Sequence, residues 1–285
     1  EKGHVRVYRL SGGISWVKEG NDIDGESNAD RSGRSVSLNN DGTILAIGSK
    51  WNDGNGNRSG HVRVYHWDGS AWVQRGADID GEAANDESGG FISLSDDGSS
   101  IAIGAHRNDG NSGSSSDDRG HVRVHDWNGL AWVQRGPDID GESEKDYSGY
   151  SVSMNNDGTV VAIGAKQNDG TTGNILDQRG HTRIYKWDGS AWVQRGVDID
   201  GESTGDNSGE SVSINDNGDM GYGSLTDSSL PVKVVDGNVS SVETNSIHVL
   251  YRDVNGSLLG FGKGTHGRLA NNSYFDSYSP IMVQD

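Results

Sequence analysis

The stretch GHVRVYHWDGSAWVQRGADIDGE, residues 60–82, decides the fold of this chain, because it returns almost unchanged at residues 120–142 and 180–202. A looser copy occupies residues 3–26. The three close copies begin 60 residues apart, and self-similarity at a fixed period of this size predicts a repeat architecture. In such an architecture each unit buries its apolar faces against its neighbours.

Each repeat is predicted to contribute two β-hairpins. Residues 4–8, HVRVY, alternate apolar and polar side chains as a strand does, and the close copies of this segment lead into a turn such as Asp68-Gly69, a strong hairpin signal. A second phrase, SVSLNNDGTILAIG, joins two more short apolar runs across Asp41-Gly42. It occupies residues 35–48 and recurs at 92–104 and 151–164. Four short strands in successive hairpins make one antiparallel sheet per repeat.

A small sheet that is apolar on both faces is not stable alone in water, and stacking such sheets radially around an axis gives a β-propeller. We therefore predict an all-β fold, a β-propeller of five to seven four-stranded antiparallel blades, with residues 1–285 as a single domain. The repeat type changes near residue 215 without a linker, so blades of two kinds are expected in one ring. The chain begins in mid-repeat and ends on a predicted strand at 281–283. We therefore expect the two ends to complete one blade, and the chain to be a piece of a longer one.

The composition favours an ordered β protein and argues against several classes of function. Only 31% of the 285 residues are hydrophobic, but they gather in short Val, Ile, Leu and Trp runs separated by turn residues. The absence of cysteine removes disulfides, thiolate zinc sites and thiol nucleophiles. The net charge of -18 argues against nucleic acid and anionic membrane surfaces as partners, and no apolar run of about 18 residues is present for membrane insertion.

The phrase at residues 35–48, followed by GHVRVYHW at residues 60–67, resembles the FG-GAP class of propeller repeats, which is related to the repeats in the head of alpha-integrins. The resemblance covers about residues 1–214. It implies a propeller of about seven blades, of the kind found in secreted or cell-surface proteins with an adhesive or structural role.

Residues 215–285 carry different motifs. These are MGYGSLTDSSLPVKV at 220–234, HVLY at 248–251, GSLLGFG at 256–262, LANN at 269–272 and PIMV at 280–283. They resemble the repeat of the regulator-of-chromosome-condensation family, although Arg268 and Ala270 stand where that pattern has Gln and Gly. That family also forms propellers, so the resemblance implies that the ring continues through the C-terminal residues.

Each repeat carries a recurring acidic motif, DIDGE, followed four residues later by an aspartate. If the motif is extended, its carboxylates project from one side of the strand and repel one another unless a cation neutralises them. Calcium is the candidate cofactor, because it takes several carboxylate oxygens. The candidate metal ligands are Asp22, Asp24, Glu26 and Asp30, with their counterparts Asp78, Asp80, Glu82, Asp86, Asp138, Asp140, Glu142, Asp146, Asp198, Asp200, Glu202 and Asp206.

The competing interpretation gives these carboxylates a purely structural role. They can accept hydrogen bonds from turn amides in the following Ser-Gly, or pair with the one arginine in the His-x-Arg segment of each repeat, at Arg6, Arg63, Arg123 and Arg183. The turn NNDG at residues 39–42 stands where integrin-type repeats hold a calcium loop, and it is too short to encircle an ion. We therefore favour the structural interpretation over calcium binding.

Three further features of the repeat are interpreted as structural. Histidines recur at His4, His61, His121 and His181, and we expect them to pack between blades, because equivalent positions of successive blades do not converge on one metal. Tryptophan pairs such as Trp67 and Trp72 are expected to pack across their hairpin. No catalytic constellation stands out from the repeat, so we predict that the chain is not an enzyme.

The leading functional hypothesis is a non-enzymatic extracellular or cell-surface module, structural or adhesive, that mediates protein–protein assembly or self-assembly through its loops. The repeats differ in length at residues 52–59 and 108–119, which marks these segments as exposed loops, and binding functions usually reside on such loops. The alternative is a propeller domain that recognises a glycan or a protein ligand without polymerising.

Overall fold

The computed structural model describes residues 2–110, 114, 116–170, 173–174, 176–216 and 218, and it describes the backbone of residues 220–223, 243–244, 248–252, 258–262 and 277–282. Every regular element in this part of the chain is a β-strand. Among the same residues there is no helix long and apolar enough to cross a membrane. The predicted all-β fold is confirmed.

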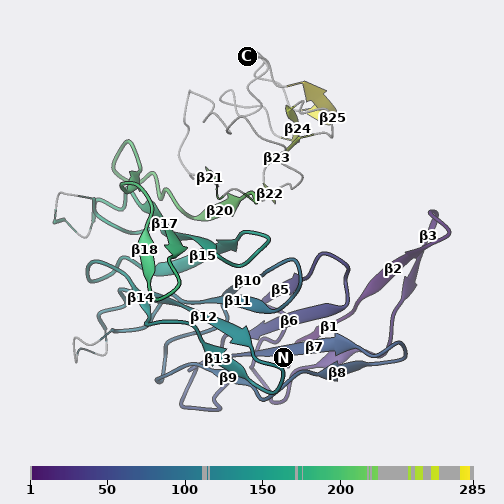
Figure 1. Cartoon of the computed structure of the whole chain (residues 1–285). Helices are drawn as coiled ribbons and strands as arrows, with labels where there is room; N and C mark the ends of the chain where they lie inside the picture. Colours follow the sequence, from purple (N-terminus) through teal and green to yellow (C-terminus); the bar gives the residue numbers. More distant parts are fainter. Residues whose placement is uncertain are drawn as a thin grey trace.

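Three consecutive repeats form three sheets of one design (Figure 1). In each sheet four antiparallel strands follow one another in chain order, and a two-residue strand pairs with the beginning of the third. The first sheet comprises β5 (Ser35–Leu38), β6 (Ile44–Ser49), β7 (His61–Trp67), β8 (Trp72–Gln74) and β9 (Ile79–Asp80). The second comprises β10 (Phe91–Leu94), β11 (Ser100–Ala105), β12 (His121–Trp127), β13 (Trp132–Gln134) and β14 (Ile139–Asp140). The third comprises β15 (Ser148–Met154), β16 (Val160–Ala165), β17 (His181–Trp187), β18 (Trp192–Gln194) and β19 (Ile199–Asp200). The predicted four-stranded antiparallel blade is confirmed, and the short fifth strand is an addition that the sequence pattern does not predict.

The remaining strands lie before and after these three sheets. Before them, β1 (His4–Val5) pairs with β4 (Ile23–Asp24), and β2 (Tyr8–Ser11) pairs with β3 (Ser15–Lys18). After them, β20 (Ser211–Ile214) pairs with β21 (Met220–Gly223). A four-stranded antiparallel sheet then follows, made of β22 (Glu243–Thr244), β23 (His248–Arg252), β24 (Leu258–Gly262) and β25 (Ser277–Met282).

Among the described strands, β25 pairs with β24 of its own sheet, and the completion of one blade by the two chain ends stays a prediction. The motif residues 224–234 and 269–272 lie outside the described residues. At the other end of the chain, the β2–β3 hairpin extends away from the sheets (Figure 1) and leaves Ile14 and Trp16 exposed.

The blades pack through apolar layers between neighbouring sheets. Val62 on β7 belongs to one buried cluster with Ile101 and Ile103 on β11 of the next sheet. The first strands β5, β10, β15 and β20 are successive neighbours, and Ser37 Oγ accepts a hydrogen bond from the backbone N–H of Leu94 at 3.1 Å. Each fully buried aliphatic side chain stabilises the fold by about 1.5–3 kcal/mol, so these layers hold the blades together.

Glycine is the last residue but one of the second strand in each of the three blades, because the next blade passes against it. A Cβ atom at Gly104 would lie 2.2 Å from the carbonyl oxygen of Gly149, and one at Gly48 would lie 2.0 Å from that of Gly89. Gly164 has an equally close neighbour. Any side chain at these positions forces the blades apart, so the close approach requires glycine.

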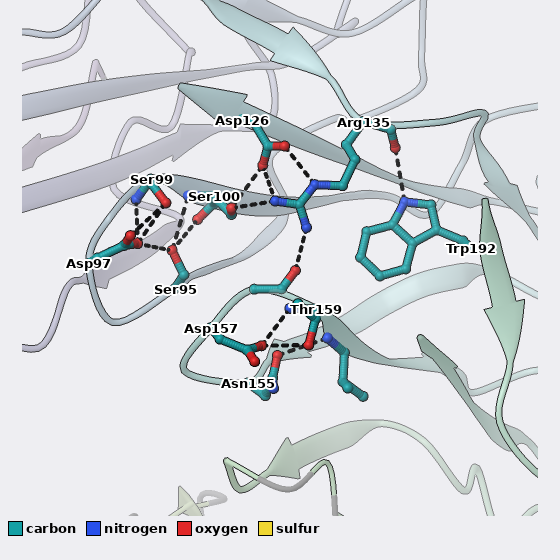
Figure 2. A network of polar contacts seen from close by, with 12 residues as sticks. Ser95, Asp97, Ser99, Ser100, Asp126, Arg135, Asn155, Asp157, Thr159 and Trp192 are labelled. Carbon is teal, nitrogen blue, oxygen red and sulfur yellow. Dashed lines mark hydrogen bonds and ion pairs between the residues drawn. The ribbon is translucent and has the colours of Figure 1, made fainter. Parts of the chain in front are cut away.

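An arginine joins the outer strands of adjacent blades, as Figure 2 shows for Arg135. Its Nε donates to Asp126 Oδ2 at 2.6 Å, and its Nη1 donates to the carbonyl oxygen of Gly158 in the next blade at 2.6 Å. Trp192 of that blade donates from Nε1 to the carbonyl oxygen of Arg135 at 2.9 Å. The predicted packing of tryptophans across their hairpin is confirmed for the Trp67–Trp72 pair and its two later copies, whose ring centroids lie 5.4–5.5 Å apart.

Candidate functional site

The structure separates the acidic residues of each motif instead of gathering them around one point. Asp78 precedes β9 and lies beside His61 of its own blade, whereas Glu82 follows β9 and lies beside His121 of the next blade. The intervening Asp80 is exposed. The separation arises because the short strand ends at Asp80 and the chain then turns toward the next blade.

The last aspartate of each motif is a turn partner. Asp86 is buried, and its Oδ2 accepts hydrogen bonds from the backbone N–H of Ala83 at 2.9 Å and from Asn108 Nδ2 at 3.1 Å. Its counterparts accept the same hydrogen bond from the amide three residues earlier, and they are Asp30, Asp146 and Asp206. These four residues are thus partners of turn amides, but the amides lie three residues before each aspartate and not in the following Ser-Gly, where the structural interpretation placed them.

The glutamate of one motif and the first aspartate of the next motif meet a histidine at the boundary between two blades. We call these groups the seam triads, and they are Glu26, His61 and Asp78; Glu82, His121 and Asp138; and Glu142, His181 and Asp198. The glutamate comes from one blade, and the histidine and aspartate come from the next. One ligand atom from each residue lies within 4.8 Å of the other two. In the middle triad, His121 Nδ1 lies 3.5 Å from Asp138 Oδ2 and 3.9 Å from Glu82 Oε2.

Neighbouring polar groups orient both carboxylates of a seam triad. Gln134 Nε2 donates to Asp138 Oδ1 at 2.7 Å, which leaves Oδ2 facing the histidine. Arg123 Nη1 lies 3.4 Å from Glu82 Oε1, which leaves Oε2 facing the histidine, and its Nη2 donates to the carbonyl oxygen of Asp80 at 2.6 Å. The same roles fall to Gln74 and Arg63 in the first triad and to Gln194 and Arg183 in the third.

The three triad histidines are buried and neutral. Each is 1% exposed, as expected for a side chain packed between blades. Burial lowers the pKa of His121 and His181 to about 4 and shifts the pKa of His61 in the same direction. The Nε2 atom of each has no hydrogen-bond partner, and neither has Nδ1 of His121. Each histidine is therefore a desolvated imidazole whose Nδ1 edge faces the two carboxylates of its triad, and Nδ1 of His181 also lies 3.9 Å from Asp200 Oδ1.

The first and last acidic motifs differ from the rest. In the first, His4 is exposed, and Asp22 pairs with Lys18 and with Arg6, whose Nη2 lies 2.9 Å from Asp22 Oδ2. Pairing with the repeat arginine is thus confirmed for Asp22. In the last, Glu202 occupies the position that Glu82 has, and the side chains of the blade that follows it lie largely outside the described residues. Asp24, Asp140 and Asp200 are exposed, as Asp80 is.

A second cluster gathers positions at which the repeats differ from one another. It lies where the first strands begin and the second strands end, beside the contacts between β5, β10 and β15. We call it the axial cluster, and its residues are Arg31, Arg34, Lys50, Trp51, Arg58, Glu87, Phe91, His106, Arg107, Tyr147, Tyr150 and Lys166. Lys50, His106 and Lys166 are equivalent positions of successive repeats, and so are Arg31, Glu87 and Tyr147.

A buried carboxylate lies at the centre of the axial cluster. Glu87 Oε2 accepts a hydrogen bond from Lys50 Nζ at 2.6 Å, and Oε1 accepts one from Trp51 Nε1 at 3.2 Å. His106 Nε2 lies 3.6 Å from Glu87 Oε2, and Arg107 Nε lies 3.6 Å from Oε1. Burial opposes ionisation of Glu87, yet Lys50 and the other cations lower its pKa. Burial lowers the pKa of His106 to about 4.

Aromatic rings and further cations surround this carboxylate. The ring centroids of Phe91 and Tyr150 are 4.8 Å apart, and Lys166 Nζ lies 3.5 Å from the centroid of Tyr150. Arg34 stacks over Phe91 with its guanidinium carbon 5.2 Å from the ring centroid. On Trp51, the guanidinium carbon of Arg31 lies 3.2 Å from the ring centroid and that of Arg58 lies 4.4 Å from it. Such cation–π contacts hold arginines flat on a surface.

The backbone at this cluster adopts conformations that non-glycine residues seldom take. Arg31, Glu87, Tyr147 and Asn207 all have φ between 52 and 55°, at the same position in four successive repeats. Left-handed backbone at non-glycine residues costs about 1–3 kcal/mol and concentrates at functional sites. Aligning the repeats with one another could have found this cluster from the sequence. The aligned positions that form the cluster differ from repeat to repeat, whereas the positions that form the triads are the same in every close copy.

No model of a known protein family matches this chain, and no curated protein matches its sequence. Solved structures do match. One, described as a complex of KlAtg21 with the coiled coil of AgAtg16, has a TM-score of 0.50 at 12% identity and covers 99% of this chain and 83% of that chain. The periplasmic gluconolactonase PpgL of Pseudomonas aeruginosa has a TM-score of 0.45 at 15% identity, with coverage of 90% and 74%.

The first of these structures is a β-propeller, and the repeated sheets define this chain as a β-propeller of four-stranded antiparallel blades. The resemblances to FG-GAP and regulator-of-chromosome-condensation repeats stay predictions, because no family model matches this chain.

Proposed function

We propose that this chain is a non-enzymatic binding propeller that docks an acidic protein partner on the axial cluster, as an adhesive or structural module outside the cell or at its surface. The observation that carries the proposal is the gathering of six cationic side chains at one place in a chain of net charge -18. They are Arg31, Arg34, Lys50, Arg58, Arg107 and Lys166.

The charge of this cluster is only partly neutralised within the protein. Among the residues that the structure describes, the carboxylate of Glu87 lies at its centre, and Asp118 faces its edge, where Oδ1 lies 3.9 Å from Arg107 Nη1. Arg31, Arg34 and Arg107 are exposed. An acidic segment of a partner that lies across them gains charge-assisted hydrogen bonds.

The aromatic rings of the axial cluster are a second feature that is typical of protein interfaces. Phe91, Tyr147, Tyr150 and Trp51 are half-buried, so each presents part of a rigid ring beside the arginines. Tyrosine, tryptophan and arginine are the side chains most enriched at the energetic centres of protein interfaces. The same combination also favours a second candidate function, recognition of an acidic glycan whose sugar rings stack on these aromatics.

Binding of defined acidic ligands tests the proposal. The 285-residue chain should bind a fluorescent polyglutamate peptide with an affinity that falls as salt is added, and not bind a polyglutamine peptide. Arg34→Ala and Arg107→Ala should each weaken binding about 5–20-fold, whereas Lys186→Ala, at an exposed position on β17, should leave it unchanged. Equal loss in all three variants would mean that the overall charge of the chain governs binding, whichever residue is changed, which would contradict a docking site.

An oligouronate probe separates the two candidates. Binding of the oligouronate that Arg34→Ala abolishes, without binding of the peptide, would favour the glycan candidate over the protein partner. The extracellular setting rests on the FG-GAP resemblance. The non-enzymatic part of the proposal is tested by incubating the chain with lactones and polysaccharides, and turnover of any of them would overturn it.

A further inference from the structure

We propose that each seam triad binds a divalent transition-metal ion of the zinc type, and that the ion links two consecutive blades. The donors are one imidazole nitrogen and two carboxylate oxygens, which leaves an open position for water in a four-coordinate site. This inference is independent of binding at the axial cluster.

The first argument is the unsatisfied histidine. His121 is 1% exposed, and neither of its ring nitrogens has a hydrogen-bond partner, although Nδ1 faces two carboxylate oxygens. Its distances of 3.5 Å to Asp138 and 3.9 Å to Glu82 are long for direct hydrogen bonds. A buried polar atom that faces two acceptors without bonding to either leaves room for a bridging cation between them.

The second argument is the spacing of the donors. A tetrahedral ion with bonds of about 2.0–2.1 Å holds its ligand atoms about 3.3–3.4 Å apart. In the three triads the distance from histidine Nδ1 to the aspartate oxygen is 3.4, 3.5 and 4.0 Å, and the distance to the glutamate oxygen is 3.9 Å in each. Small side-chain adjustments are enough to close these distances.

The third argument is the support behind each ligand. Metal-binding carboxylates are commonly fixed by a hydrogen bond to the oxygen that does not bind the ion. Gln134 makes that hydrogen bond to Asp138, and Arg123 lies beside the outer oxygen of Glu82. The same arrangement occurs in all three triads. Because it repeats at 60-residue intervals, it is a regular feature of the boundary between blades and not a single accidental contact.

The donor set also selects the class of ion. Calcium prefers about six to eight oxygen ligands and does not favour imidazole, whereas zinc and its neighbours accept mixed nitrogen and oxygen donors. The seam triads therefore differ in chemistry from the calcium site expected from the acidic motif alone. Because glutamate belongs to one blade and histidine with aspartate to the next, an ion bound here stabilises the boundary between them.

Equilibrium dialysis against Zn²⁺, with metal analysis of the untagged 285-residue chain, tests the proposal. Glu26→Gln, Glu82→Gln and Glu142→Gln should each remove one bound ion per chain, and the triple variant should lose three. Glu144→Gln is the matched control, because it changes an exposed glutamate outside the triads, and it should lose none. Unchanged zinc binding in the triple variant would assign the metal to adventitious surface sites and overturn the proposal.

A variant that keeps only one triad allows a single metal site to be measured. In the double variant Glu26→Gln with Glu142→Gln only the middle triad remains, so Co²⁺ should give one tetrahedral visible spectrum that His121→Gln abolishes. Adding Gln134→Ala to this background should weaken the affinity about 10–100-fold, because Gln134 orients Asp138. Zinc should raise the unfolding midpoint of the unaltered chain and not that of the triple variant. Binding of Ca²⁺ but not Zn²⁺ or Co²⁺ would overturn the choice of ion.

Discussion

Replacement of Arg135 by methionine tests how much the arginine contacts between blades contribute to stability. The Arg135 side chain is 15% exposed and donates to the carboxylate of Asp126, to Ser100 Oγ at 2.8 Å and to the carbonyl oxygen of Gly158 in the next blade (Figure 2). Hydrogen bonds to charged groups contribute about 1.5–3 kcal/mol each when they are shielded from water. Asp126 is 38% exposed and regains water when the arginine is lost, so we expect Arg135→Met to cost about 2–4 kcal/mol.

The repeat supplies its own control for this experiment. Arg75 occupies the same position one repeat earlier and donates to the carbonyl oxygen of Gly98 at 2.9 Å. His66 stands there in place of Asp126, and Ile44 in place of Ser100. Arg75→Met lacks the carboxylate contact and should therefore cost only about 1–2 kcal/mol.

The assay is equilibrium unfolding in urea followed by tryptophan fluorescence, which reports on the seam directly because Trp192 donates a hydrogen bond to the carbonyl oxygen of Arg135. A double-mutant cycle of Arg135→Met with Asp126→Asn should give a coupling free energy of about 1–2 kcal/mol. Equal costs for Arg135→Met and Arg75→Met, or a coupling energy near zero, would refute the argument.

Three further predictions concern packing and titration. Gly104→Ala should destabilise the protein by about 1–3 kcal/mol or more, because the added Cβ meets the carbonyl oxygen of Gly149. An unchanged thermal midpoint would show that the two blades can move apart at little cost. Lys50→Met should cost about 3 kcal/mol in urea unfolding by leaving the carboxylate of Glu87 buried without its cation, and adding Glu87→Gln should recover most of that loss; no recovery would mean that packing of the lysine stem dominates. His106, which faces Glu87, Lys50, Arg107 and Lys166, has a folded-state pKa of about 4 against 6.5 when unfolded. The unfolded chain therefore takes up the proton first, and stability is lost as the pH falls from about 6.5 toward 4, by about 2 kcal/mol between pH 7 and pH 5 for this histidine; urea titrations of His106→Gln should show a shallower decline, and an identical decline would contradict the assignment.

Constant and variable positions of the repeat have separate tasks in this propeller. The positions that recur in every close copy make the contacts between blades. Examples are the triad histidines and the glycines Gly48, Gly104 and Gly164. The positions that differ from copy to copy, such as Lys50 and His106, meet at the beginning of the first strands. A repeat protein holds its architecture with the first set and can specialise one surface with the second.

The sequence by itself determined the architecture of this protein. Alternating residues and Asp-Gly turns specify strands and hairpins within a few neighbouring residues, so the four-stranded blade and its 60-residue period can be read without coordinates. The tryptophan pairs and the aspartates that accept turn amides were predictable for the same reason, because their partners lie within the same hairpin or loop.

The tertiary structure alone decided which distant residues meet. Asp78 and Glu82 stand four residues apart in one motif, yet they belong to different triads, because the chain leaves one blade between them and the contact to His121 forms across the seam. The axial cluster likewise collects residues from positions 31 to 166. Local patterning says nothing about how blades are rotated against one another or which strand lies innermost. These depend on packing between whole sheets, and that packing places the cluster and the triads.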